Sequence, residues 1–179
     1  MNEFDQINNL FPIPRKEIIN MQSYSEPLEN RRNLLRLDFN ENTLGPSQKV
    51  YEAIKDINLN QISIYPEYNL LKKFVSNHYY ESRQFDSEEI GLFNGADAAI
   101  NAIFNSFGDR DEIFLTTNPT FGYYSPCSEI QGMRKITCAY EGENFLFPIK
   151  RFEAEIIKHK PKLIFICNPN NPTGTVLSA

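Results

Sequence analysis

The architecture of this chain is indicated most clearly by Asn168–Pro169–Asn170–Asn171–Pro172–Thr173–Gly174, which directly follows the apolar run Leu163–Cys167. A short apolar run bounded by turn residues is typical of a buried strand. In the loop after it, each proline fixes its own φ angle and restricts the residue before it, and Gly174 permits unusual backbone geometry. A lone Asn-Pro pair would indicate only a tight turn. The whole string predicts a rigid loop that aims an asparagine amide, which has both a donor and an acceptor, at a ligand oxygen.

Strand and helix patterns alternate through the rest of the chain. Short apolar or alternating runs predict strands at residues 35–39, 90–93, 112–116, 135–139 and 163–167. Apolar residues at helical spacing predict helices at 47–57, 67–80, 96–107, 121–131 and 149–158, with a short one at 15–21. Such alternation predicts an α/β fold with a mostly parallel sheet and flanking helices. Ligands of these sheets bind at the carboxyl ends of strands, where residues 94–97, 118–121 and 168–174 are expected to lie.

Composition and charge disfavour several classes of protein. The 179 residues carry a net charge of −5, so no basic field would offset repulsion from nucleic-acid phosphates. The chain has no run of about 18 apolar residues that would predict a membrane span, and the polar segment 1–9 has no signal-peptide pattern. Cys127, Cys138 and Cys167 are widely spaced and form no metal-binding motif. We therefore expect reduced thiols, no bound metal and a cytoplasmic location.

A candidate phosphate site lies at Asn94–Gly95–Ala96–Asp97, between a predicted strand and a predicted helix. A glycine there lets the backbone approach a ligand closely. The N-terminus of the helix offers free N–H groups and the positive end of the helix dipole, which favour an anion. Alone the segment is weak evidence, because Asp97 also simply favours a first helical turn. It lacks the full G-x-G-x-x-G pattern of dinucleotide sites.

A candidate for ring stacking lies at Asn118–Pro119–Thr120–Phe121–Gly122–Tyr123–Tyr124, after another predicted strand. An aromatic side chain just past a strand end can lie flat on a planar ligand. The alternative interpretation is that Phe121 belongs to the hydrophobic core.

These segments, in this order, resemble the fold-type-I aminotransferases that depend on pyridoxal phosphate, and Cys167–Gly174 is most similar to histidinol-phosphate aminotransferases. The resemblance implies pyridoxal 5′-phosphate as cofactor. In this family the asparagine before Pro-Thr-Gly, here Asn171, bonds the ring hydroxyl oxygen. The Gly-Ala-Asp segment, here Gly95, Ala96 and Asp97, binds the phosphate through the backbone N–H groups of its last two residues. The aromatic after Pro-Thr, here Phe121, stacks on the pyridine ring.

Two further segments match the same family. Tyr65–Pro66–Glu67 resembles a Tyr-Pro-Asp/Glu whose tyrosine reaches across a dimer to the partner's cofactor phosphate, so the resemblance implies a homodimer. The segment containing Asn40, Glu41 and Asn42, followed by Gly45–Pro46–Ser47, resembles the family's segment at the substrate entrance. Thr43–Leu44 stands where the family commonly has Pro-Tyr, which leaves the amino substrate open.

The family's Schiff-base lysine lies downstream of Asn-Pro-Thr-Gly, as do the carboxylate that faces the pyridine nitrogen and the arginine that binds the substrate carboxylate. No lysine of this chain has the family's Ser-Lys context. We therefore expect an N-terminal arm at 1–34 and an incomplete large cofactor-binding domain at 35–179, without the remainder of that domain or the small domain. We expect no catalytic residue in this chain, and no activity of the chain alone.

The resemblance implies an aminotransferase that transfers an amino group between a small amino donor, such as histidinol phosphate, and a 2-oxo acid such as 2-oxoglutarate. Three alternatives stay open, namely another amino donor, a decarboxylase or other lyase of the same fold, and a non-catalytic truncated remnant. A nucleotide-binding α/β module is disfavoured, because neither the dinucleotide pattern nor a Gly-Lys-Ser/Thr phosphate loop is present.

Overall fold

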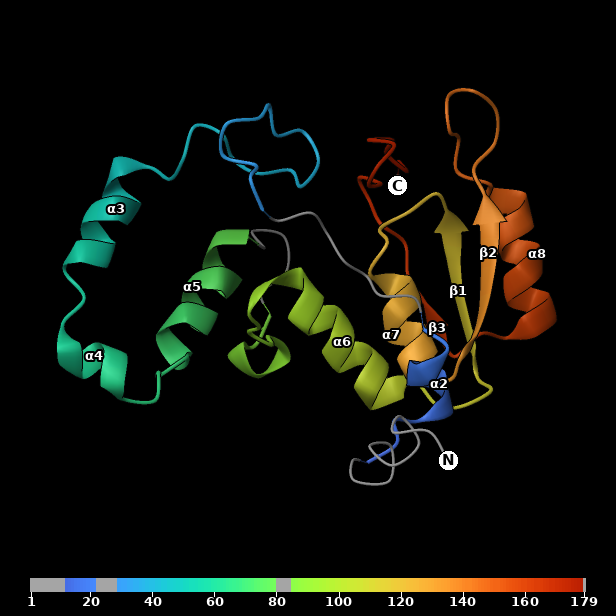
Figure 1. Ribbon diagram of the computed structural model, residues 1–179, viewed down its shortest axis with the longest axis horizontal. Coiled ribbons are helices and arrows are strands. Elements are labelled where there is room, and N and C mark those ends of the chain that lie inside the picture. Colours follow the sequence, from blue (N-terminus) through green and yellow to red (C-terminus); the bar gives the residue numbers. More distant parts are fainter. Residues whose placement is uncertain (1–11, 22–28, 80–84, 179) are drawn as a thin grey trace, which may run out of the picture. The chain divides into compact units, whose positions relative to one another are not determined.

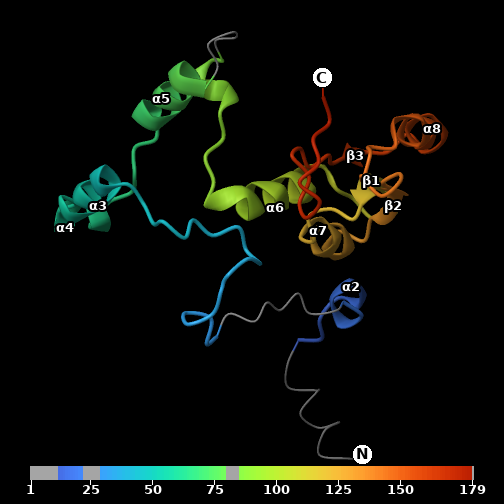
Figure 2. The ribbon, with the colours of Figure 1, turned by 90° about the horizontal axis from the view of Figure 1, so that it is seen from above.

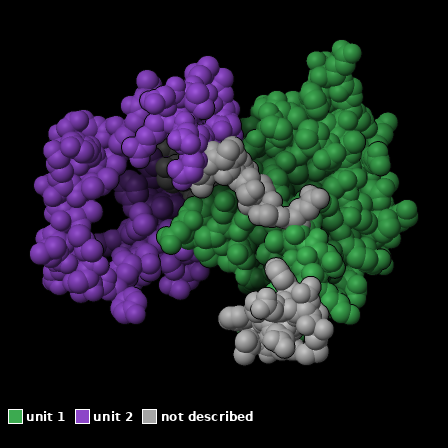
Figure 3. Space-filling model, in the orientation of Figure 1, with its two compact units in different colours: residues 1–24, 93–179 green, residues 25–92 purple. Residues whose placement is uncertain are grey.

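The computed structural model describes residues 12–21, 29–79 and 85–178. They fall into two compact units, unit 1 with residues 1–24 and 93–179, and unit 2 with residues 25–92 (Figure 3). In unit 1 the elements are α2 (Lys16–Ile19), α6 (Gly95–Phe107), β1 (Ile113–Asn118), α7 (Tyr124–Ile130), β2 (Arg134–Ala139), α8 (Ile149–His159) and β3 (Leu163–Ile164) (Figure 1). In unit 2 they are α3 (Gln48–Lys55), α4 (Leu59–Ser63), α5 (Asn69–Tyr79) and the 3₁₀ helix η1 (Ser87–Glu89).

The sheet of unit 1 is parallel, with strand order β2-β1-β3. Strand β1 pairs with β2 along its whole length, from Ile113 opposite Arg134 to Asn118 opposite Ala139. On its other side β1 pairs with the short β3, Leu115 lying opposite Ile164. The predicted α/β class and parallel sheet are thus confirmed, and the carboxyl ends of β1 and β3 meet at the same edge of the sheet.

Helices cover both faces of this sheet because the two crossover connections run in opposite directions. The chain passes from β1 through α7 to β2 on one side, and then through α8 back across β1 to β3. Right-handed crossovers in opposite directions place their helices on opposite faces. Figure 2, which looks along the strands, shows α7 on one face and α8 on the other.

Strand β1 is the centre of the core, and its burial on both faces matches a central parallel strand. Phe114 joins Phe104, Tyr124 and other residues on the face covered by α6 and α7. The ring of Phe104 stacks on Phe165 with centroids 4.9 Å apart and meets Phe114 edge-on at 5.0 Å. On the opposite face, a smaller cluster places Leu115, Cys138 and Phe152 beneath α8.

Residues 12–21 are tied to the α7 side of unit 1 by two polar contacts. The guanidinium of Arg15 donates from Nη2 to the carbonyl oxygen of Ile130 at 2.6 Å, which satisfies a carbonyl in the last turn of α7. Glu17 forms an ion pair with Arg110. The helix predicted at 15–21 is confirmed as α2, and these contacts explain why so short a helix is held.

The helices of unit 2 begin at clear capping signals. Ser47 accepts a hydrogen bond from the N–H of Val50 at the start of α3, and Asn58 and Gln61 form a reciprocal capping box at the start of α4. Their apolar sides stay open within the described residues, since Ile54 of α3 and Phe74 of α5 are both exposed.

Two predicted strands are wrong. Residues 35–39 form no strand, although Leu35 and Leu37 alternate with polar residues as a strand would. Alternation indicates a strand only where a neighbouring strand supplies hydrogen bonds, and both leucines are largely exposed here. Residues 90–93 are likewise irregular, following the 3₁₀ turn η1. The other predicted elements are present with shifted ends, whereas α4 was not predicted.

Candidate functional site

Two loops meet at the carboxyl edge of the sheet, the loop of residues 119–123 after β1 and the loop of residues 168–174 after β3. Asn170 joins them and is only 3% exposed. Its Oδ1 accepts a hydrogen bond from the hydroxyl of Thr120 at 2.9 Å, and its Nδ2 donates to the carbonyl oxygen of Pro119 at 3.0 Å. The same Nδ2 donates to the hydroxyl of Thr173 at 2.8 Å. The loop that carries Phe121 is therefore fixed to the loop that carries Asn171.

The structure distinguishes the three asparagines of the 168–174 loop. The amide of Asn168 exchanges two hydrogen bonds with the backbone of Leu177, each 3.0 Å long. The amide of Asn170 has both Nδ2 hydrogens committed. Asn171 is half-buried, and its side chain makes no hydrogen bond to any residue that the structure describes. Of the three amides, that of Asn171 alone has no partner among the described residues.

The N-terminus of α6 is open at the predicted phosphate site. Gly95 has φ +79°, a left-handed conformation that favours glycine, and a Cβ added there would have no heavy atom within 4 Å. The preceding Asn94 does not cap the helix with its side chain. The first N–H groups of a helix have no carbonyl partner inside it, so those of Ala96 and Asp97 are available to an anion beside exposed backbone.

Phe121 is half-buried and packs against the aromatic core under α6 and α7. Its ring meets that of Tyr124 nearly perpendicularly, at 82° with centroids 5.6 Å apart. The predicted stacking role and the alternative role in the core both fit a ring that is partly accessible, so the stacking role stays a prediction.

Polar groups of α6 and α7 meet near these loops. Tyr123 interacts with Asn101 of α6 and Cys127 of α7. Burial raises the pKa of Tyr123, as do Cys127 and, more weakly, the Asp97 carboxylate; Asn101 opposes the shift. Helices α6 and α7 also pack against each other. The helix that begins at the predicted phosphate site and the helix that follows the predicted ring-stacking segment are therefore neighbours within unit 1.

Burial also raises the pKa of Tyr124, to about 12, with a further contribution from Cys167. Because the folded pKa lies above the ordinary value of 10.0, this phenol contributes stability that is present below pH 10 and lost as the pH rises towards 12.

Between pH 10 and pH 12 we expect the free energy of unfolding to fall by up to about 1.4 kcal/mol per pH unit. Urea denaturation at pH 9 to 12 should show a shallower fall for Tyr124→Phe than for the wild type. The same change at the exposed Tyr68 should leave the wild-type curve unchanged, and identical curves for Tyr124→Phe would contradict the expectation.

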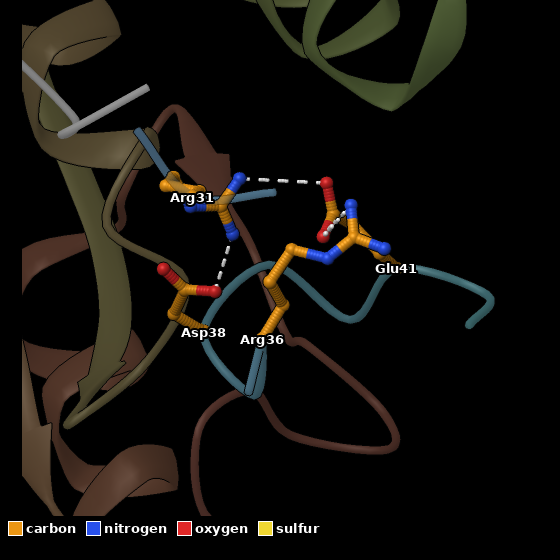
Figure 4. Close-up of polar contacts among 4 residues, drawn as sticks. All are labelled: Arg31, Arg36, Asp38 and Glu41. Carbon is orange, nitrogen blue, oxygen red and sulfur yellow. Dashed lines mark hydrogen bonds and ion pairs between the residues drawn. The ribbon is translucent and has the colours of Figure 1, made fainter. Parts of the chain in front are cut away.

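Unit 2 contains Tyr65 and the segment 40–42, and each is described within its own unit. Tyr65 is 97% exposed. The segment 40–42 contributes Glu41 to a network of charged side chains (Figure 4). Arg31 binds Asp38 at 2.5 Å and Glu41 at 3.4 Å, and Arg36 binds the other oxygen of Glu41 at 3.4 Å.

The guanidinium of Arg31 also lies over the ring of Phe39, 4.1 Å from its centroid. A hydrogen bond from Arg31, with its positive charge, holds the pKa of Asp38 below its ordinary value. Asn40, between these contacts, has φ +55°. The network therefore folds residues 31–41 into a compact turn where the alternating pattern predicted a strand.

Replacing Asp38 by asparagine should loosen this turn, because Arg31 loses its shortest ionic contact. Trypsin needs an arginine side chain free to enter its specificity pocket. We expect cleavage after Arg31 to become several-fold faster in Asp38→Asn, followed by mass spectrometry of the peptides. Asp56→Asn, at an exposed position beyond α3, is the matched control. An unchanged rate would show that the contact does not hold the turn.

Sequence reasoning missed Asn170 and Thr120, which connect the two loops of unit 1, and Arg31, which holds the turn of residues 31–41 in unit 2. Thr120 and Asn170 each follow the end of a predicted strand, and parallel strands bring such ends to one edge of the sheet. Their positions in the sequence could therefore have indicated that these two residues lie close together. For Arg31 no such signal existed, because its partners depend on a local turn that the pattern did not indicate.

Three further points concern the cysteines, possible metal ligands and possible membrane-spanning helices of the described residues. Cys127 and Cys138 are buried free thiols, and Cys167 is half-buried and unbridged. In the described part of the chain, no group of three or more His, Cys, Asp or Glu side chains is arranged to hold a metal ion. None of the described helices is both long and apolar enough to cross a membrane.

Comparison with known proteins identifies the family. Residues 32–179 match the family described as aminotransferase class I and II. The chain belongs to this family. The expected resemblance is thereby confirmed.

Two relatives of the chain have names that refer to phosphorylated compounds. The chain is 32% identical over 164 residues to a histidinol-phosphate aminotransferase of Caldanaerobacter subterraneus, covering 91% of this chain and 45% of the relative. It is also 32% identical over 147 residues to a dihydroxyacetone phosphate transaminase of Campylobacter jejuni, covering 81% of this chain and 39% of the relative. The chain therefore spans less than half the length of these relatives.

A solved member of the family has the same fold. The crystal structure of histidinol-phosphate aminotransferase from Sinorhizobium meliloti in complex with pyridoxal-5′-phosphate aligns with a TM-score of 0.62 and 17% identity. The alignment covers 75% of this chain and 35% of that one. At this identity the likeness concerns the fold alone.

Proposed function

We propose that this chain supplies the cofactor-binding part of a pyridoxal 5′-phosphate-dependent aminotransferase. The observation that carries the proposal is the free amide of Asn171, in a loop whose other two asparagine amides are committed. It lies at the carboxyl edge of the sheet, the usual ligand edge of this class of fold. The family match supports the same assignment.

The residues present fit the cofactor in three respects. The open N-terminus of α6 offers N–H groups of Ala96 and Asp97 to a phosphate dianion, and Gly95 leaves room beside them. The Asn171 amide can donate to the ring hydroxyl oxygen. Phe121 is accessible enough to lie against the pyridine ring. When bound, the cofactor supplies an electron sink for chemistry at the substrate's α-carbon.

For the whole enzyme we propose amino transfer between a phosphorylated small amine and a 2-oxo acid such as 2-oxoglutarate. Support for a phosphorylated substrate comes from the names of the two relatives, which refer to histidinol phosphate and dihydroxyacetone phosphate. We propose histidinol phosphate as the amino donor.

We also propose a homodimer in which Tyr65 binds the partner's cofactor phosphate, with residues 40–42 at the substrate entrance. The exposure of Tyr65 is compatible with this role. The division into an arm at 1–34 and a domain from residue 35 stays a prediction.

Binding of pyridoxamine 5′-phosphate tests the cofactor site. This form lacks an aldehyde and cannot react with surface lysines, so its fluorescence reports only the non-covalent site. We expect saturable binding by the wild type. Asn171→Ala should weaken binding about 10- to 100-fold, because a hydrogen bond to a charged group contributes about 1.5 to 3 kcal/mol.

The matched control is Asn168→Ala, which removes an amide from the same loop whose partner is the Leu177 backbone. It should lower thermal stability and leave the affinity within about twofold of the wild type. Absence of saturable binding by the wild-type protein would overturn the proposed function. Equal losses in both variants would overturn the assignment of Asn171.

A further inference from the structure

Asn170 differs from an ordinary loop asparagine because all its hydrogen-bond donors are used. Its two Nδ2 hydrogens go to Pro119 and Thr173, and its backbone N–H donates to the carbonyl oxygen of Thr175 at 2.8 Å. Its own carbonyl oxygen accepts from the N–H of Gly174 at 2.7 Å. A buried amide satisfied in this way is held in one orientation, since any rotation would leave buried polar groups unpaired.

A chain of hydroxyl groups extends this contact in both directions. Thr120 donates its hydroxyl hydrogen to Asn170 Oδ1 at 2.9 Å. On the other side, the hydroxyl of Thr173 accepts from Asn170 and lies 2.7 Å from the hydroxyl of Thr175. Four side chains, one from the loop after β1 and three from residues 170–175, thus form one connected network at the carboxyl edge of the sheet.

Two members of this network lie next to residues of the proposed cofactor site. Thr120 directly precedes Phe121, and Asn170 directly precedes Asn171. The bonds between Thr120, Pro119 and Asn170 therefore fix the start of the ring-stacking segment relative to the start of the amide-bearing segment.

We propose that Thr120 and Asn170 are positioning residues, which set the separation and orientation of Phe121 and Asn171 against the cofactor ring without touching it. This inference rests on the proposed function, because it concerns the same site. A ring held between a stacked aromatic and a directional hydrogen bond tolerates little displacement of either partner. The affinity for the ring and its orientation should both depend on the Thr120–Asn170 contact.

Thr120→Val tests the proposal, because it keeps the shape of the side chain and removes its hydroxyl. We expect pyridoxamine 5′-phosphate to bind about 3- to 10-fold more weakly, as one neutral hydrogen bond contributes about 0.5 to 1.5 kcal/mol. The induced circular dichroism of the bound pyridine ring should also change in amplitude, since it reports the ring's orientation. Thr120→Ser, which restores the hydroxyl, should recover both quantities.

Two further variants separate positioning from general destabilisation. Thr173→Val removes the acceptor on the other side of Asn170 and should repeat the loss if Thr120→Val does not fold. Thr137→Val makes the same replacement at an exposed position of β2 and should leave affinity and dichroism unchanged.

The outcomes distinguish this inference from the proposed function. A wild-type protein that binds no pyridoxamine 5′-phosphate contradicts the proposed function itself. A wild type that binds, together with folded Thr120→Val or Thr173→Val proteins of unchanged affinity and dichroism, overturns the positioning role. If a variant loses thermal stability without any change in the dichroism of the bound ligand, the network has a purely structural role. That result also overturns the proposed positioning role.

Discussion

Replacing Phe104 by alanine is expected to lower the free energy of unfolding by about 3 to 5 kcal/mol, the usual cost of removing a fully buried phenylalanine side chain. Phe104 is completely buried, and its ring contacts both Phe114 of β1 and Phe165 beyond β3. Its removal would leave a cavity between α6 and the sheet, because the surrounding rings can close it only partly. Urea denaturation followed by far-ultraviolet circular dichroism measures the loss.

The matched control lies three residues along the same helix. Phe107, the last residue of α6, is 58% exposed, so Phe107→Ala makes the same replacement in the same helix without opening a cavity. We expect an effect within about 0.5 kcal/mol of zero, as for most surface substitutions. If the two variants were equally destabilised, the core would not be centred on the contact between α6 and the sheet. If neither were, the aromatic cluster would not hold unit 1 together.

The sheet could be predicted because its information is local. Strands β1 and β2 are short apolar or alternating runs, and each is followed by turn residues and a helix of clear periodicity. Right-handed crossovers then leave little choice of topology. The loops after β1 and β3 could be placed at one edge for the same reason, which is why residues 118–121 and 168–174 were expected together.

The remaining features depend on contacts between residues that a pattern does not connect. Leu35 and Leu37 alternate like a strand, but the ion pairs of Arg31 with Asp38 and Glu41 favour a turn instead. Likewise, Asn168, Asn170 and Asn171 are chemically identical in the sequence. The resemblance to the family singles out Asn171, and only the hydrogen bonds of the folded chain show that Asn170 is buried and that Asn168 is bound to backbone. The role of Asn171 toward a cofactor stays a prediction.

Replacing Gly95 by valine is expected to weaken binding of pyridoxamine 5′-phosphate about 10- to 100-fold, because one hydrogen bond to a charged phosphate contributes about 1.5 to 3 kcal/mol. At φ +79° a β-branched residue is strained, although a Cβ there would meet no heavy atom within 4 Å. The backbone at the start of α6 must therefore rotate, and the N–H groups of Ala96 and Asp97 would turn away from the phosphate. Fluorescence titration measures the affinity, and competition by inorganic phosphate isolates the part due to the phosphate group.

Gly142→Val provides the control for backbone strain. Gly142 has φ +65° in the turn between Glu141 and Leu146, and a Cβ there would also meet no heavy atom within 4 Å. Both variants should lose about 1 to 3 kcal/mol of stability through strain, and only Gly95→Val should lose affinity. Because the two changes cost the same kind of strain, a difference in affinity can arise only from the place of Gly95 at the open end of α6. Equal affinities would show that this helix end does not bind the phosphate, and the cofactor would then have to be held by Asn171 and Phe121 without it.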